Sequence, residues 1–227
     1  MKRTTLAVAA AALMICSANA QDDLAPITLN APDLNRPASL MQAFSKRASN
    51  TNYADRALSL QDMSDLLWAA NGFNRPAEKK RTAPSALNFQ DIDIYVFLAE
   101  GAYFYDAEAS VLKPVAKGDF RAEIVPQLPP KDMPHPPALL VLVSDLARHT
   151  RNPSEPGKAK AATIDAGTLK TAALDAGIVS QNISIFCAGV GMVTRCRASL
   201  NTEKLKGILN LSDAQLPILN HPVGYGK

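Results

Sequence analysis

The chain has 227 residues, of which 47% are apolar, 20% are charged and 6% are aromatic. This composition is typical of a globular protein with one sizeable core, and it excludes a disordered or collagen-like chain. Lysine and arginine number 24 against 21 aspartate and glutamate residues, a formal charge of +3. Such a balanced charge argues against nucleic acid or an anionic membrane surface as the partner, because those partners select a clustered basic excess.

Residues 1–20 have the pattern of a secretory signal. Lys2 and Arg3 precede an apolar run from Leu6 to Cys16, and Ala18-Asn19-Ala20 supplies the small residues that a signal peptidase accepts. The 11 apolar residues of this run are too few to cross a hydrocarbon core, which needs about 20. We therefore expect this segment to be removed, which lowers the net charge from +3 to +1, and we expect a periplasmic protein.

The mature chain keeps two cysteines, Cys187 and Cys196. An oxidising compartment allows them to pair but does not require it, because a disulfide also needs compatible Cβ geometry. We favour Cys187 as a small buried residue on a helix. The cysteines and the three histidines form no HxxxH, CxxC or HExxH spacing, so we expect no metal site.

The amino-terminal part of the mature chain is predicted to be an arm followed by two helices. Residues 21–37 contain three prolines and should form an irregular, extended arm ahead of one domain at 38–227. A first helix is predicted after Ala38, with one apolar face at Leu40, Ala43 and Phe44. A second helix is predicted between a cap at Ser59 and Gly72, with Trp68 in the core.

Strands are predicted in the middle of the chain. The segment from Ile92 to Asp106 contains two runs of β-branched and aromatic residues that turn at Glu100-Gly101. After a proline-rich connection at 126–137, the run from Ala138 to Leu146 is continuously apolar, which is typical of a central strand. The polar segment from Arg148 to Lys160 is expected to be a surface loop.

The remaining chain alternates irregularly between helix and strand. The longest helical candidate runs from Ala161 to Gly191, and Gly167 and Gly177 indicate either a break or close helix packing. The last predicted elements are a strand and loop at Met192 to Leu200, a helix at Glu203 to Leu209 and a strand at Leu216 to Val223. This order favours an α+β protein over a regular βα repeat.

Standard catalytic motifs are absent from the sequence, which has no Gly-x-Ser-x-Gly, P-loop or GxGxxG. An enzyme without an evident nucleophile or metal often takes its reactivity from an organic cofactor. Arg47 and Ser49 follow a predicted helix and are suited to hold a phosphate. The alternative is that the basic residues only complement the helix C-terminus.

Two further segments are suited to a flat ring. Pro84-Ser85 fixes a turn, and Asn88 offers the donor and acceptor that the pyrimidine edge of a flavin needs, although this loop equally suits the capping of a strand. After Gly191, an extended segment ends at Arg197-Ala198-Ser199, and its backbone N–H groups are suited to a flavin N5. The alternative for Arg195 and Arg197 is a pair of solvated surface charges.

In this order the segments resemble the nitroreductase family of FMN-dependent oxidoreductases, and more narrowly its short branch allied to SagB-type and ThcOx-type dehydrogenases. The resemblance runs from about Leu40 to Lys227. Its most specific stretches are DLLWAANGFNRP (Asp65 to Pro76), RTAPSALNFQDIDIYVF, GAYFYD, the helix that begins with Gln181-Asn182 and ends in GVGM, and the terminal VGYGK.

The resemblance implies an α+β, nitroreductase-like fold, with a central mixed sheet flanked by helices. It also implies an intertwined homodimer that holds FMN at the subunit interface. By position, the phosphate segment is matched by Arg47 and Ser49, the loop beside the isoalloxazine ring by Pro84, Ser85 and Asn88, and the segment that passes flavin N5 by Arg197 and Ala198.

Two departures from the family pattern concern the phosphate. Thr51 stands where members often have a second basic residue, and the chain ends at Lys227, where many have a further basic segment. We therefore expect reduced phosphate affinity, for which Arg197 or Lys227 compensates. SagB-type members that oxidise azolines are usually larger, so that substrate is not implied.

The implied activity is two-step hydride transfer through flavin N5, from a donor to a quinone, a nitroaromatic or a similar small-molecule acceptor. No side chain is needed as a general base, because the protein positions and tunes the cofactor. An exported enzyme leaves the cytoplasmic nicotinamide pool behind, so the electron donor is left open. Two alternatives stand beside this activity. One is a non-catalytic envelope binding protein on the same fold, and the other is an enzyme for another planar cofactor, such as a cobamide precursor or a deazaflavin.

Overall fold

A computed structural model describes residues 24–125, 135–149 and 164–227. The expected signal at 1–20 lies outside the described residues, as do most of the proline-rich connection and most of the polar loop after Arg148. Ala161, the predicted start of the long helix, lies outside them as well, but the prediction was too early: the helix begins at Ala166, where Asp165 Oδ1 accepts from the Thr168 N–H at 2.8 Å.

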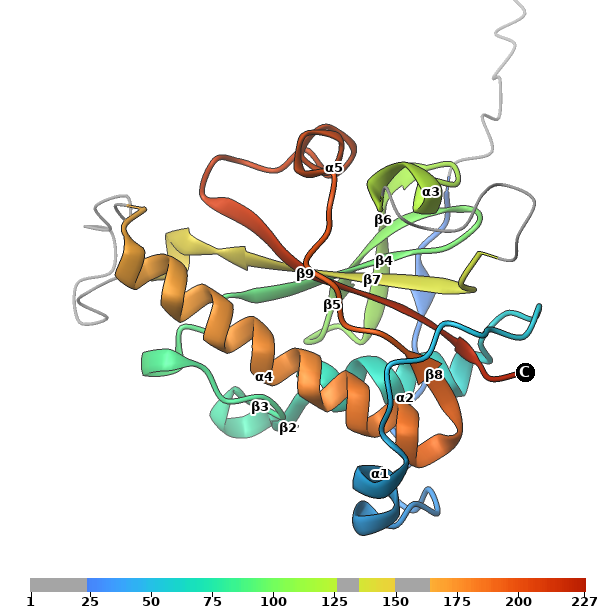
Figure 1. The fold of residues 1–227 in the computed structure, drawn as a ribbon. Coiled ribbons are helices and arrows are strands. Elements are labelled where there is room, and N and C mark those ends of the chain that lie inside the picture. The colour runs from blue at the N-terminus through green and yellow to red at the C-terminus, as the bar shows by residue number, and fades with distance from the viewer. Residues whose placement is uncertain (1–23, 126–134, 150–163) are drawn as a thin grey trace, which may run out of the picture.

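A seven-stranded sheet forms the centre of the molecule, with the strand order β1-β6-β5-β4-β7-β9-β8 (Figure 1). Its strands are β1 (Ile27–Thr28), β4 (Ile92–Phe97), β5 (Gly101–Asp106), β6 (Val111–Lys117), β7 (Ala138–Asp145), β8 (Met192–Thr194) and β9 (Gln215–Tyr225). These neighbours pair antiparallel, and a parallel bridge joins Ser49 to Thr194. The predicted α+β class, with a central mixed sheet flanked by helices, is confirmed. The parallel pairing that makes the sheet mixed is this bridge between Ser49 and Thr194.

The predicted hairpin and central strand are confirmed. β4 and β5 pair Phe97 with Ala102, and the turn is closed where the Leu98 N–H donates to the Gly101 carbonyl at 2.9 Å. β7 lies between β4 and β9, and its first seven residues are buried. Because both faces of this strand are covered, its continuous apolar run has no polar alternation.

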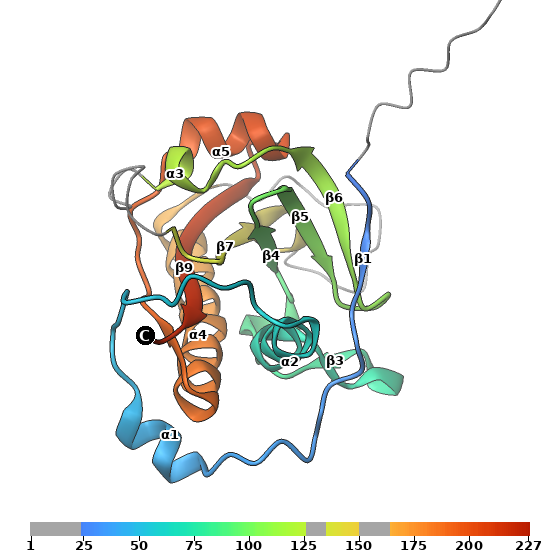
Figure 2. The same cartoon turned by 90° about the vertical axis from the view of Figure 1, so that its right-hand side faces the viewer.

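Helices cover both faces of the sheet. α2 (Leu60–Asn71) and α4 (Ala166–Val190) pack on one face, while α3 (Arg121–Ile124) and α5 (Thr202–Leu209) lie on the other, as Figures 1 and 2 show. A separate two-stranded sheet joins β2 (Phe73–Arg75) to β3 (Lys80–Arg81). The core therefore has two layers of apolar side chains, one on each side of the central strands.

The predicted ends of α2 and the predicted carboxyl-terminal end of α4 are confirmed by their hydrogen bonds. Ser59 Oγ accepts from the Asp62 N–H at 3.1 Å, and the Gly72 N–H donates to the Trp68 carbonyl at 2.8 Å. α4 ends at Val190, and its C-cap Gly191 has φ of +78°. Such left-handed C-caps favour glycine because it has no Cβ.

Two expectations about the packing of α4 and α2 need correction. α4 runs unbroken through Gly167 and Gly177, and a Cβ built on Gly177 meets no heavy atom within 4 Å. This glycine therefore marks neither a break nor a close contact. Trp68 is half-buried rather than in the core, and its indole Nε1 donates to the Phe73 carbonyl at 3.2 Å.

The apolar face predicted for α1 (Leu40–Lys46) is largely exposed. Ala43 is buried against α4, but Leu40 and Phe44 are 64% and 52% exposed. Figure 2 shows the arm running from β1 along the side of the molecule to this helix. In a single chain this face of α1 has no partner among the described residues.

The long helix α4 belongs to the core. By length and composition alone it is a helix that could cross a membrane. Ala176, Ile183 and Cys187 are nevertheless buried in the apolar cluster that α4 forms with α2 and the sheet. Cys187 is thus the buried helical residue we predicted, while Cys196 is exposed, and both are free thiols.

Candidate functional site

The predicted phosphate segment meets the chain that follows β8. Ser49 bridges Thr194, and the Asn50 N–H donates to the Thr194 carbonyl at 2.9 Å. Arg47 caps the C-terminus of α1 just before this bridge, and Arg195 comes directly after it. Both arginines are exposed, and neither has an ion-pair partner among the described residues. Long-range pairing thus gathers uncompensated positive charge around Ser49.

The end of the chain lies against the same segment. Tyr53 bridges Gly226, and the Lys227 N–H donates to the Asn52 carbonyl at 3.2 Å. Tyr53 is buried, which raises the pKa of its phenol, while the nearby charges of Arg197 and Arg195 act in the opposite direction. Lys227 therefore lies close in space to Ser49, although they stand at opposite ends of the domain.

The segment predicted to pass flavin N5 is only partly available as a donor. The Arg197 N–H donates to the Asn220 carbonyl at 3.0 Å, and the Asn220 N–H donates back at 2.7 Å. The backbone N–H groups of Cys196 and Ala198 have no acceptor within the described part of the chain. Of the two predicted residues, Ala198 is the one that has a backbone donor to offer. β8 ends at Thr194, so the strand that would place Arg195 and Arg197 on one face does not extend that far.

The predicted ring-facing loop connects β3 to β4. Pro84 and Asn88 are exposed, whereas Ser85 is half-buried and its Oγ accepts from the Gln90 N–H at 2.9 Å. The loop contains a 3₁₀ turn over Ala86–Asn88. Three non-glycine residues of the loop have left-handed backbones, Leu87 (φ +48°), Asn88 (φ +58°) and Gln90 (φ +50°). Such conformations persist only where surrounding contacts impose them, and they are often found at functional sites.

Buried polar side chains hold this loop from behind. Both carboxylate oxygens of Asp175, on α4, accept from the Ala86 N–H at 3.0 Å. Asp175 is 3% exposed, and it stands beside the fully buried Asp91. Sequence analysis missed both aspartates, although a lone acidic residue in the apolar stretch TAALDAGIV was a detectable signal.

The loop lies beside the amino-terminal half of α4, whereas the basic segment lies at its carboxyl-terminal end (Figure 1). The loop is held at Asp175, whereas α1 packs at Gly189, where a built Cβ would lie 3.4 Å from Ala43 Cβ. These two helical positions are roughly 21 Å apart along the axis at a rise of about 1.5 Å per residue. One chain therefore brings Arg47, Ser49 and the 195–198 segment together, but it does not bring Pro84, Ser85 and Asn88 to them.

The family model of the nitroreductases matches residues 44–225. The chain belongs to the nitroreductase family. A structure from Ralstonia eutropha JMP134, provisionally assigned as a nitroreductase, shares 30% identity over 89% of this chain and 90% of that one, with a TM-score of 0.75. A nitroreductase family protein of Clostridium difficile 630 shares 18% identity over 82% and 84% of the two chains, with a TM-score of 0.52.

A chain of the E. coli microcin synthetase McbBCD complex shares the fold of this nitroreductase-family protein. Its identity is 17% over 80% of this chain and 70% of that one, with a TM-score of 0.65. No curated protein matches the sequence. The predicted family and its oxidoreductase class are thus confirmed, while the narrower branch allied to SagB and ThcOx stays a prediction.

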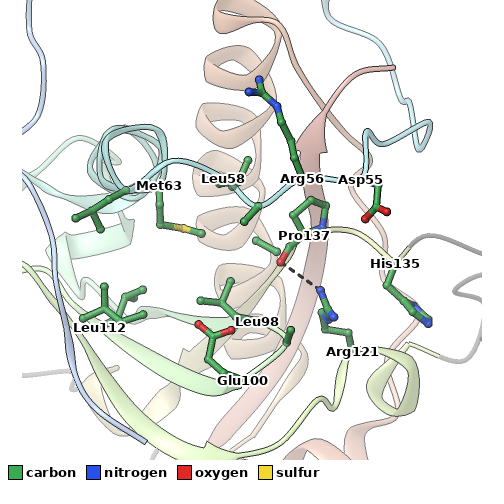
Figure 3. Close-up of a pocket in the computed structure, with 15 residues that line it drawn as sticks. Asp55, Arg56, Leu58, Met63, Leu98, Glu100, Leu112, Arg121, His135 and Pro137 are labelled. Atoms are coloured by element: carbon green, nitrogen blue, oxygen red, sulfur yellow. Dashed lines mark hydrogen bonds between the residues drawn. The ribbon is translucent and has the colours of Figure 1, made fainter.

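A separate cavity of about 490 Å³ opens near the start of α2 (Figure 3). Its apolar wall is formed by Leu58, Met63, Leu98 and Leu112. Two arginines line it, but both are engaged: Arg121 donates to the Pro136 carbonyl at 2.9 Å, and the Arg56 guanidinium lies 3.6 Å from the centre of the Tyr225 ring. None of the residues predicted to bind a cofactor lines this cavity, so in this nitroreductase-family chain it is distinct from the candidate site.

Proposed function

We propose that this protein is an exported FMN-dependent oxidoreductase that acts as a homodimer. It would pass hydride through flavin N5 to a quinone, a nitroaromatic or a similar small acceptor. The observation that carries the proposal is the bridge between Ser49 and Thr194, which joins the Arg-x-Ser segment to the arginines after β8. Neither segment is a phosphate site alone, whereas together they form a basic cradle with a hydroxyl.

The donor set of this cradle fits the phosphate of FMN. Arg47 and Arg195 are exposed without ion-pair partners among the described residues, and Ser49 adds a hydroxyl. At the far loop, Pro84 offers an apolar face to a ring, and the exposed Asn88 amide offers a donor and an acceptor. The free N–H of Ala198 suits N5. FMN, when bound, supplies the hydride chemistry, and the chain's residues bind and orient it.

The homodimer is supported by the separation of these two groups and by exposed apolar side chains. Leu40, Met41 and Phe44 on α1 are all more than half exposed. Leu40 also lines a groove of about 310 Å³, together with Trp68 and Phe186. Apolar patches of this kind mark interaction sites, and a twofold dimer buries the same patch on both chains. A second copy that packs along α4 would bring its loop at 84–90 to the basic cradle of the first.

The proposed export rests on the sequence rather than on the fold, and so does the need for an electron donor outside the cytoplasm. The signal pattern at 1–20 supports transport across the inner membrane. Because a periplasmic enzyme is separated from cytoplasmic nicotinamides, the proposal calls for a different reductant. The departure at Thr51 would weaken phosphate binding, and the position of Lys227 beside Asn52 is suited to offset that loss.

An absorbance spectrum of the mature protein tests the proposal directly. After FMN is added and the protein is desalted, retained bands near about 370 and 450 nm are expected for an oxidised flavin. A charged hydrogen bond contributes about 1.5–3 kcal/mol, so Arg47→Ala should weaken FMN binding by roughly one to two decades. Arg75→Ala, which removes an exposed arginine of β2, is the matched control and should bind FMN normally.

A desalted protein that stays colourless would contradict the proposal. It would favour the non-catalytic binding protein on the same fold. A retained chromophore with a spectrum unlike that of FMN would instead favour another planar cofactor. Equal FMN affinity in Arg47→Ala and the parent would remove Arg47 from the phosphate site.

A further inference from the structure

Two buried carboxyl groups lie in contact behind the loop at 84–90. Asp91, which precedes β4, is fully buried, and Asp175 on α4 is 3% exposed. Their side chains lie within hydrogen-bonding reach of each other. Asp91 Oδ1 is buried and receives a hydrogen bond from no donor in the described part of the chain. Two carboxylates that touch away from water cannot both ionise without strong repulsion, so one proton between them supplies the missing donor.

The surroundings of the pair contain little positive charge to replace that proton. Ser144 Oγ, on β7, donates to Asp91 Oδ2 at 2.5 Å, and His149 Nε2 lies 3.0 Å from the same oxygen, off the line of a good hydrogen bond. The neighbouring guanidinium of Arg148 pairs with Asp93 at 2.8 Å and with Asp145 at 3.2 Å. Among the described residues, His149 is therefore the one basic side chain that lies against the aspartate pair.

The same cluster anchors the loop at two points. Asp175 holds the Ala86 N–H with both oxygens at 3.0 Å. The His149 ring stacks on Phe89 with centroids 4.5 Å apart. The left-handed backbones of Leu87 and Asn88 lie between these anchors, and such conformations need external contacts to persist. The arrangement of the loop thus depends on the state of the buried cluster.

We propose that Asp91 and Asp175 share one proton, and that this protonated pair positions the 84–90 loop for its ligand. Asp175 is then a positioning residue, because it touches the loop backbone and not the ligand. That the ligand is FMN rests on the proposed function, whereas the control of the loop by the pair does not. The stability of the closed loop then depends on pH. The pair holds the loop more tightly at pH values where it keeps its proton and less tightly where it has lost it.

The direction follows from the balance of forces on Asp175. Burial, the largest influence, and Asp91 favour the neutral form of Asp175, while the Ala86 N–H and His149 favour its ionised form. Burial and Asp91 outweigh the other two, since the pKa of Asp175 is raised to about 6. A carboxyl released into water would return towards its ordinary pKa. By linkage, the closed loop therefore loses stability relative to the open loop as pH rises from about 4 through about 6.

Hydrogen exchange of the Ala86 amide in the cofactor-free protein tests the proposal. After correction for the intrinsic rate, protection of this amide should fall by more than about tenfold between pH 4.5 and pH 7.5, with an upper limit near a hundredfold for a shift of about two pH units. Asp175→Asn keeps an oxygen acceptor for Ala86 but removes the shared proton, so its protection should not change with pH. Asp106→Asn, which breaks a surface ion pair with Lys113, is the matched control and should behave like the parent.

Protection of Ala86 that does not change with pH in the parent would overturn the proposal. So would an Asp175→Asn variant that keeps the parental pH dependence. If Asp175→Asn does not fold, Asp91→Asn removes the same proton from the other side and must abolish the same pH dependence. FMN affinity over the same pH range is a separate measurement. A protein that never binds FMN contradicts the proposed function but leaves the exchange result to decide this inference.

Discussion

At the residue scale, His221 shows how burial fixes a protonation state. Thr194 Oγ1 donates to the Pro222 carbonyl at 2.9 Å, so its contact with His221 Nδ1 at 3.1 Å must be donated by the histidine. The other ring nitrogen, Nε2, then accepts from Ser180 Oγ at 2.8 Å. His221 is fully buried, and desolvation lowers its pKa to about 4. The neutral imidazole thus joins α4, β8 and β9.

This histidine should make the fold sensitive to acid. Because its pKa is lower in the folded state than in the unfolded chain, the unfolded state binds more protons between about pH 4 and 6.5, and stability falls as pH falls through that range. The parent should lose about 2–3 kcal/mol of unfolding free energy between pH 7 and pH 4.5 relative to His221→Gln, measured by urea unfolding.

The half-buried His135 supplies the control for this experiment. His135→Gln should retain the acid sensitivity of the parent. Equal pH dependence in His221→Gln and the parent would show that His221 is not the responsible group. Asp175 contributes with the opposite sign, since its pKa is raised, so only the difference between parent and variant isolates the histidine.

At the element scale, local signals predicted the elements whose ends and faces are set by nearby residues. Ser59 and Gly72 marked α2, and the apolar runs marked β4, β5 and β7. Four strands were missed, β1, β2, β3 and β6, because pairing with a neighbouring strand rather than a local side-chain pattern defines them. β6 contains Pro114 and two lysines, and β1 has only two residues, yet each completes a ladder with a neighbour. The proline and lysines of β6 interrupt its strand pattern, and the two β-branched residues of β1 are too short a run to predict a strand.

Gly177 inside α4 and Gly191 at its C-cap should respond oppositely to the same substitution. Gly177 lies inside the helix with open space around it, so Gly177→Ala should stabilise the protein by about 0.5–1 kcal/mol through backbone entropy. Gly191 has φ of +78°, so Gly191→Ala should destabilise it by about 1–2 kcal/mol.

Urea unfolding of the two glycine variants measures both effects under one set of conditions. Each serves as the control for the other, because a built Cβ meets no heavy atom within 4 Å at either position. If Gly177→Ala destabilises the protein, the space around Gly177 is occupied. A second chain packed against this part of α4 would occupy it.

At the scale of the whole molecule, the apolar face of α1 is the clearest sign of a partner. Met41 is 75% exposed beside Leu40 and Phe44, on a helix whose one buried residue is Ala43. Phe44→Glu should therefore dissociate the proposed dimer, because a buried unpaired charge in an interface costs several kcal/mol. Sedimentation of the parent and the variant measures this change.

Loss of the dimer should also remove FMN, since the two halves of the proposed site lie on different chains. Val115→Glu, at an exposed apolar position on β6, is the control and should keep both the dimer and the cofactor. A Phe44→Glu protein that remains dimeric would show that α1 is outside the interface. A monomer that still binds FMN tightly would show that one chain is sufficient.

The sequence by itself determined the family, the α+β class and the order of the main elements, because caps, apolar periodicity and short motifs are local properties. It also indicated the Arg-x-Ser segment and the Pro-Ser-x-x-Asn loop as places for chemistry. Only the tertiary structure decided what these segments contact. Ser49 meets Thr194, and Ala86 meets Asp175, across 145 and 89 sequence positions. Because such contacts depend on pairing and burial between distant segments, no local pattern specifies them.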